Sequence, residues 1–174
     1  MREPSGDVLD RFELPARFLI RACAEEDLEN LEWFGMFTAH REIIREAFRR
    51  HRAGDNPMLV LDLGGFPVGQ AWIDLAKKRD ASTGILWALR VFPIFQGMGL
   101  GTRLLHAAEG IIRGAGHAVA EIGVERTNEG ARRLYERLGY ALAGEEREEY
   151  SYEQPDGTRI EAVSDMLLFH KPLG

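Results

Sequence analysis

The chain has 174 residues, which is enough for one compact domain and short for two. Hydrophobic residues make up 45% of it, close to the average for a globular protein, so disorder over most of the length is excluded. The formal net charge of -6 argues against nucleic acid as a partner, because nucleic-acid binders usually present a broad basic surface. The single cysteine, Cys23, excludes an intrachain disulfide. With no membrane-spanning run or signal peptide expected, we predict no membrane contact and a cytoplasmic location.

Hydropathy and turn residues predict the elements in chain order. Residues 1–16 hold two prolines and a glycine among charged residues, so we expect an N-terminal extension ahead of one domain over 17–174. The acidic residues at 25–27 suit the positive end of a helix, and an apolar stripe follows them. The predicted elements are a strand at 18–22, helices starting at 25 and over 38–51, strands at 58–63, 68–75 and 85–92, a helix at 100–115, a strand at 118–125, a short helix after 128, and strands at 141–153 and 160–170.

This order of elements predicts a single-domain α/β fold with a mixed, mostly antiparallel sheet and helices on both faces. Turn residues at 64–67 and 155–158 join consecutive strands as hairpins. The long C-terminal hairpin also offers an edge at which two copies could pair, so a homodimer is a candidate state.

A glycine-rich turn, Gln96-Gly97-Met98-Gly99-Leu100-Gly101, lies between a predicted strand and a predicted apolar helix. Glycines let the backbone approach a bulky anion, and the unpaired amides at a helix start can hold phosphate oxygens. The turn is not a P-loop, because Thr102 and Arg103 follow it in place of Lys and then Ser or Thr. A dinucleotide fingerprint that starts at Gly97 needs glycine where Thr102 stands. The third possibility is the pyrophosphate of coenzyme A.

The turn resembles motif A of the GNAT superfamily of acetyltransferases, which reads Arg or Gln, two residues, Gly, one residue, and Gly or Ala. Gln96, Gly99 and Gly101 match that pattern. The preceding Leu89-Arg90-Val91-Phe92-Pro93 resembles the family's fourth strand, and residues 128–140 resemble its Asn, Ala, Leu-Tyr and Leu-Gly-Tyr signature. The motifs span roughly residues 85–140, and the element order extends the likeness to nearly the whole chain.

The resemblance implies acetyl-CoA as cofactor and a role for each matching residue. The cofactor-binding residues would be Leu89, Arg90, Val91, Gln96, Gly97, Met98, Gly99, Leu100, Gly101, Thr102 and Asn128. In that set, backbone groups of Leu89 and Val91 would pair with the pantetheine arm as an added strand, and amides of 96–102 would hold the pyrophosphate. Asn128 would bind the cofactor further along, although it is also a natural helix cap.

Tyr135 is the catalytic residue that the resemblance implies, as the donor of a proton to the departing thiolate. An unperturbed phenol has a pKa of about 10, so it holds its proton at neutral pH. Tyr135 also shares a helix face with Ala131 and Leu138, which is the pattern of a packing tyrosine.

The sequence assigns no general base. In the similar ribosomal-protein alanine acetyltransferases a Glu stands on the fifth strand, five residues before the motif Asn, where this chain has Gly123. Glu121, Glu125 and Asp74 are candidate substitutes, and a chain of water molecules is another. The five histidines have no metal-ligand spacing, so no metal is expected.

We therefore predict an acetyl-CoA-dependent N-acetyltransferase that moves an acetyl group to a primary amine by direct attack in a ternary complex. The acidic run at 144–150 favours a small cationic amine as acceptor, and Gly123 points away from a ribosomal-protein substrate. Two alternatives stay open. One is a peptide acceptor, as in a protein N-terminal acetyltransferase, and the other is a non-catalytic acyl-CoA-binding regulatory module.

Overall fold

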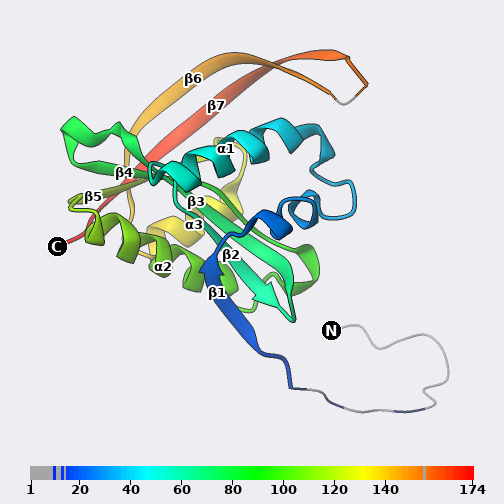
Figure 1. The fold of residues 1–174 in the computed structure, drawn as a ribbon. Helices are drawn as coiled ribbons and strands as arrows, with labels where there is room; N and C mark the ends of the chain where they lie inside the picture. The colour runs from blue at the N-terminus through cyan, green and yellow to red at the C-terminus, as the bar shows by residue number, and fades with distance from the viewer. Residues whose placement is uncertain (1–9, 11–12, 14, 155) are drawn as a thin grey trace.

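The computed structural model describes residues 10, 13, 15–154 and 156–174, and it shows one sheet with helices on both faces (Figure 1). The extension expected over 1–16 falls largely outside the described residues. The strands are β1 Phe18–Ala22, β2 Met58–Leu63, β3 Phe66–Lys78, β4 Thr83–Val91, β5 Val119–Glu125, β6 Ala141–Glu153 and β7 Arg159–Pro172. The helices are α1 Arg41–Ala53, α2 Leu100–Gly114 and α3 Glu129–Arg137. No helix of the described chain is long and apolar enough to cross a membrane.

The seven strands lie in the order β1-β2-β3-β4-β5-β7-β6, and neighbours run antiparallel except for β4 and β5. The expected mixed, mostly antiparallel sheet is therefore confirmed. The parallel pair is joined through α2, because parallel neighbours need a crossover. Its pairing runs only from Thr83 opposite Val119 to Leu86 opposite Ile122, although both strands continue beyond it. The two strands therefore stop pairing partway along.

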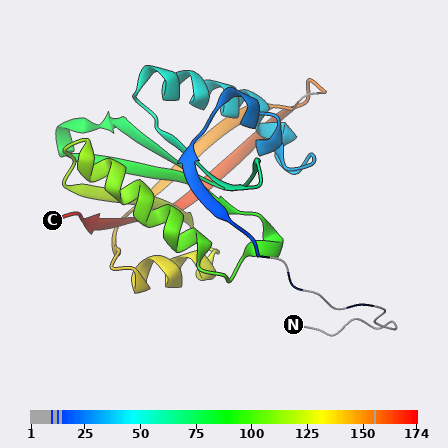
Figure 2. The same cartoon turned by 60° about the horizontal axis from the view of Figure 1, so that its bottom comes forward.

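Two hydrophobic cores hold the layers together, and Figure 2 shows α1 on one face of the sheet with α2 and α3 on the other. On the α2 face, Leu104, Leu105 and Ile112 are fully buried against the sheet. A side chain on Gly84 of β4 would come within 2.7 Å of Ile112, so the glycine lets α2 lie close to the strand. On the other face, Ala47 of α1 contributes to a second buried cluster.

The helix predicted from residue 25 is wrong, since two short 3-10 turns, Glu25–Asp27 and Asn30–Glu32, take its place. Trp33, Phe34 and Gly35 then follow with φ of 45°, 58° and 95°, and left-handed backbone cannot continue a right-handed helix. Phe34, which belongs to the apolar stripe that follows residues 25–27 in the sequence, is 85% exposed. The second predicted helix is present as a 3-10 turn at Thr38–His40 that leads into α1.

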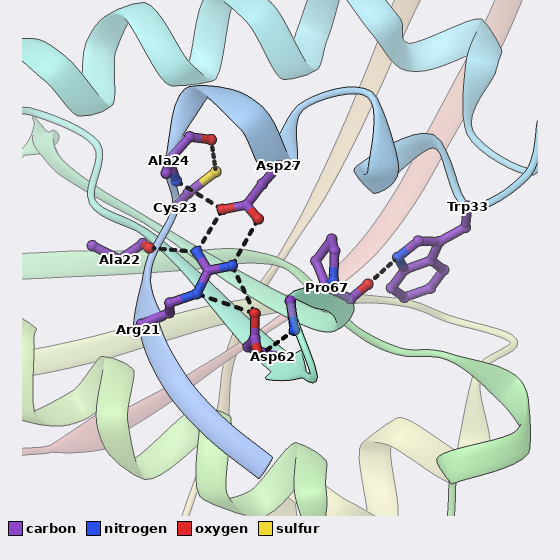
Figure 3. A network of polar contacts seen from close by, with 9 residues as sticks. Arg21, Ala22, Cys23, Ala24, Asp27, Trp33, Asp62 and Pro67 are labelled. Carbon is purple, nitrogen blue, oxygen red and sulfur yellow. Dashed lines mark hydrogen bonds and ion pairs between the residues drawn. The ribbon is translucent and has the colours of Figure 1, made fainter. Parts of the chain in front are cut away.

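A buried ion-pair network explains why the acidic run does not start an α-helix (Figure 3). The Arg21 guanidinium donates to both carboxylate oxygens of Asp27, at 2.6 and 2.8 Å, and to Asp62 at 2.8 Å. Asp27 also accepts from the backbone N–H of Ala24, and it is 1% exposed. Burial opposes ionisation of Asp27, but the bonds from Arg21 and Ala24 hold its pKa below the usual value. The carboxylate therefore ties the 3-10 turn to β1 and β2.

Replacing Arg21 with methionine should lower the free energy of unfolding by about 3 kcal/mol, because two buried carboxylates lose their cation. Chemical denaturation at neutral pH measures this loss. Arg45→Met is the matched control, because Arg45 pairs with Glu42 where both side chains are exposed, and its loss should stay under about 0.5 kcal/mol. Equal losses in the two variants would contradict the structural role given to Arg21.

Candidate functional site

A cleft of about 780 Å³ opens beside the end of β4, and it gathers segments that lie far apart in the sequence. Its walls are the last residues of β4, the glycine turn with the start of α2, one side of α3, and the segment after the second 3-10 turn. The predicted site residues among its lining are Leu89, Arg90, Val91, Gln96, Gly97, Gly99, Leu100, Gly101, Thr102 and Tyr135. Met98 and Asn128 are exposed and lie outside that lining.

The end of β4 offers an unpaired backbone edge toward this cleft. Beyond Leu86, β4 has no pairing with β5, while Arg90 and Val91 still pair with β3 on the other side. Ala88 stands between with φ of 52°, at a register shift in the β3–β4 ladder. Such a bulge re-aims a strand, and an alanine gives no sequence signal for it. The free edge of residues 87–91 can accept an extended ligand as an added strand.

The glycine turn presents a row of free amides. Gly97 and Gly99 have φ of 79° and 75°, which is the left-handed region that glycine enters without strain. Within the described chain, the backbone N–H groups of residues 97–102 donate to no other residue. The Gln96 side chain donates to the Val91 carbonyl at 3.0 Å and so links the turn to β4. Free amides at the start of a helix dipole form an anion site, so the residues fit a pyrophosphate.

Asn128 and Tyr135, the two site residues predicted at α3, have different surroundings in the structure. The Asn128 side chain accepts from the Ala131 N–H at 3.1 Å, so it caps α3. Tyr135 lies near the end of α3 and is only 6% exposed. It lines the cleft, and its ring centre lies 6.4 Å from the ring centre of Phe169. Tyr135 therefore packs in the core and also forms part of the cleft wall.

The hydroxyl of Tyr135 donates to no described protein atom, so it is available to a ligand. Burial raises the pKa of this phenol to about 12, and it therefore keeps its proton at any physiological pH. Cys23 is not an alternative reactive group, because burial raises its thiol pKa to about 12 and it does not line the cleft.

Two of the three candidate bases are engaged elsewhere. Glu121 is 3% exposed and bonds both Lys78, at 2.6 Å, and His170, at 2.6 Å. Burial would raise its pKa, but these two partners hold the pKa below the usual value. Asp74 binds Arg50 and two backbone N–H groups, so it is a structural carboxylate. Glu125 is exposed at the end of β5.

Among the cleft residues that the sequence did not assign to the site, Trp33, Met36 and Phe37 come from the N-terminal part of the chain, far in sequence from the motifs. They lie at the end of the first expected helix and ahead of the second, where the left-handed backbone at residues 33–35 sets the path of the chain. Trp33 is anchored by its indole N–H, which donates to the Pro67 carbonyl at 2.7 Å (Figure 3). In contrast, no residue of the acidic run at 144–150 is among the described lining, and Glu145 of that run pairs with Arg126.

Two parallel strands that stop pairing, beside a turn whose backbone N–H groups are free, are the features of a class of proteins that bind coenzyme A by its extended arm and its pyrophosphate. The comparisons agree, because the model of the acetyltransferase (GNAT) family matches residues 22–140. The chain belongs to this family, whose enzymes take the acetyl group from acetyl-CoA.

The similar proteins differ in how much they share with this chain. An uncharacterized N-acetyltransferase of Methanocaldococcus jannaschii is 26% identical over 149 residues, which cover 76% of this chain but only 64% of that relative. The Salmonella typhimurium acetyltransferase yncA, solved with its cofactor acetyl-CoA, is 19% identical with a TM-score of 0.70 over 91% of this chain and 95% of that one. The Escherichia coli ribosomal-protein-S18-alanine N-acetyltransferase is 20% identical with a TM-score of 0.66, again over 91% and 95%. Both structural likenesses concern the fold.

Substituting Gly99 with alanine should weaken acetyl-CoA binding about fivefold, since a left-handed φ costs an alanine about 1 kcal/mol and the turn would relax away from it. Isothermal titration measures the affinity. Gly110→Ala is the control within the same helix, where open space and regular backbone should leave binding unchanged and raise stability slightly. Unchanged affinity in Gly99→Ala would argue against the turn as the anion site.

Proposed function

We propose that this protein transfers the acetyl group of acetyl-CoA to the primary amine of a small molecule, by direct attack in a ternary complex. The observation that carries the proposal is that an unpaired strand edge, a row of free amides and a buried phenol face one cleft. Each answers one need of the reaction: to orient the arm, to anchor the phosphates and to supply a proton.

The cofactor would be held by this chain's backbone more than by its side chains. The free edge at Leu89 and Val91 would pair with the pantetheine arm, and the amides of 97–102 would hold the pyrophosphate. Asn128 contributes as the cap that fixes the start of α3, and we keep its direct contact with the cofactor as a prediction. Acetyl-CoA supplies the thioester whose carbonyl carbon the amine attacks.

Tyr135 would assist the leaving group. As the amine nitrogen bonds to the carbonyl carbon and the carbon–sulfur bond breaks, the sulfur takes the electron pair. A phenol whose pKa is about 12 stays protonated and can donate a hydrogen bond, and then the proton, to that thiolate. Glu121 and Asp74 are already ion-paired, so Glu125 and a chain of water molecules are the remaining candidates to take the proton of the amine, and no general base is assigned.

The acceptor is the finer part of the proposal. A small amine, cationic until it loses its proton, is favoured over a protein N-terminus, because the position where ribosomal-protein enzymes have Glu is Gly123. A carbon placed on Gly123 would lie 3.1 Å from Met166, so this stretch of β5 is closely covered. The cytoplasmic location and the homodimer expected from the sequence stay predictions.

Changing Tyr135 to phenylalanine should lower kcat about 100-fold and leave the acetyl-CoA dissociation constant unchanged, because only the proton donor is lost. Thiol release with a panel of amines and N-terminal peptides measures kcat, and titration measures affinity. Tyr140→Phe is the matched control, since its hydroxyl donates to Glu109 and does not line the cleft, so it should lose stability and keep kcat.

The same assay separates the proposal from its alternatives. Saturable acetyl-CoA binding without transfer to any acceptor would identify a non-catalytic acyl-CoA-binding module. Transfer to peptides and to no small amine would identify a protein N-terminal acetyltransferase. No saturable binding would falsify the cofactor assignment itself.

A further inference from the structure

Arg90 is a largely buried charged residue of the cleft whose side chain the proposed chemistry does not use, whereas Arg133 and Arg137 of the same lining are exposed. Its guanidinium carbon lies 4.2 Å above the centre of the Phe37 ring, in cation–π contact. Burial lowers the pKa of Arg90, and no carboxylate counteracts that effect. Among the side chains that the structure describes, no carboxylate lies within ion-pair distance of it.

Three other arginines of this chain differ from Arg90 in their partners. Arg21, Arg41 and Arg50 each pair with a buried carboxylate. Burying part of a cation without such a partner is unfavourable, and proteins keep that arrangement where a ligand supplies the missing charge. Arg90 differs from these three arginines in having no carboxylate partner among the described residues, and its position in the cleft would let an anion from outside the chain supply one.

A second unpaired polar group lies beside Arg90. Gln70 stands directly opposite Arg90 on β3, and opposed residues of an antiparallel pair share one face. Gln70 is fully buried, and neither its amide nitrogen nor its amide oxygen has a partner in the described chain. Fully buried amides without hydrogen bonds are rare in proteins. The Gln70 amide and the Arg90 guanidinium are therefore neighbouring groups that could still form hydrogen bonds to a ligand.

Arg90 lies on the face opposite to the cofactor groups. Gln70 also stands opposite Val60, which belongs to the core under α1, so Arg90 faces the α1 side. Leu89 and Val91 pack instead against the core under α2, whose start carries the free amides. The phosphates of the cofactor thus have their own site, and Arg90 belongs to the half of the cleft lined by Trp33, Met36 and Phe37.

We propose that Arg90 binds a carboxylate of the acceptor, so that the acceptor is an amino acid with an apolar side group. A guanidinium matches a carboxylate with two parallel hydrogen bonds, and Trp33, Met36 and Phe37 offer the apolar wall. This inference rests on the proposed function and sharpens its acceptor from a cationic amine to a zwitterion. A polyamine would place a second cation beside Arg90 and is disfavoured.

The test compares acceptors that differ only in the carboxylate. L-phenylalanine is paired with 2-phenylethylamine, L-methionine with 3-(methylthio)propylamine, and spermidine represents polycations. Thiol release should give the amino acids a kcat/KM about 10- to 100-fold above their decarboxylated partners, which is the range of one charge-assisted contact. Arg90→Gln should remove that preference. It should leave acetyl-CoA affinity unchanged, because the substitution keeps the backbone of β4, through which the cofactor-binding residues 89–91 are expected to pair with the cofactor.

Arg45→Gln on the exposed side of α1 is the control for loss of an arginine, and it should keep the wild-type preference. Equal rates for acids and amines in the wild type, or an equal drop for both in Arg90→Gln, would overturn the Arg90 assignment.

A binding measurement tests the carboxylate site independently of turnover. Phenylacetate and neutral phenylacetamide are added to the CoA-loaded protein, and the shift in melting temperature is compared between wild type and Arg90→Gln. A shift with phenylacetate alone, lost in Arg90→Gln, supports the carboxylate site even if no amine is acetylated, and the failure then lies with the proposed transfer. Similar shifts for both compounds, or none for phenylacetate, would overturn the inference.

Discussion

The cleft of this protein depends on hydrogen bonding between β4 and β5 ending at Leu86 and Ile122. Where two parallel strands pair fully, their facing N–H and C=O groups are consumed and nothing can be inserted between them. Here the two strands continue unpaired, with the left-handed Ala88 next along β4 after Trp87. The end of β4 therefore keeps backbone groups for a ligand while its other edge stays anchored to β3.

The polar and charged groups of the sheet and of the cleft fall into two sets, those paired within the protein and those left for a ligand. Carboxylates near the middle of the sheet, such as Glu121 and Asp74, are held by cations and contribute to the fold. Several groups that have no hydrogen-bond or ion-pair partner among the described residues lie around the end of β4: the amides of 97–102, the Tyr135 hydroxyl and the Arg90 guanidinium. A folded chain normally satisfies the hydrogen bonds of its own polar groups. Several polar groups without partners in one cleft therefore indicate a binding site.

Local sequence was a good guide where an element depends on its own residues. The bounds of β1, β2 and β6 agree with prediction, and α2 begins at Leu100 as expected, because alternation, helical spacing and glycine turns act over short distances. The stretch after residue 25 failed for the opposite reason. Asp27 is bound by Arg21 and lies in one network with Asp62, which is far away in the sequence, and that buried charge network outweighs the helical pattern.

The sequence by itself determined the elements expected to bind the acetyl donor. The glycine turn needs left-handed backbone, and the motif around Asn128 and Tyr135 identifies α3 as the helix that lines the same cleft. Only the tertiary structure decided what surrounds the acceptor. Arg90 lies over Phe37, opposite Gln70 and in the same cleft as Trp33, because strands and turns from separate parts of the chain meet there. Whether a charged side chain finds a partner depends on such distant neighbours, so no local pattern can show that Arg90 is left without one.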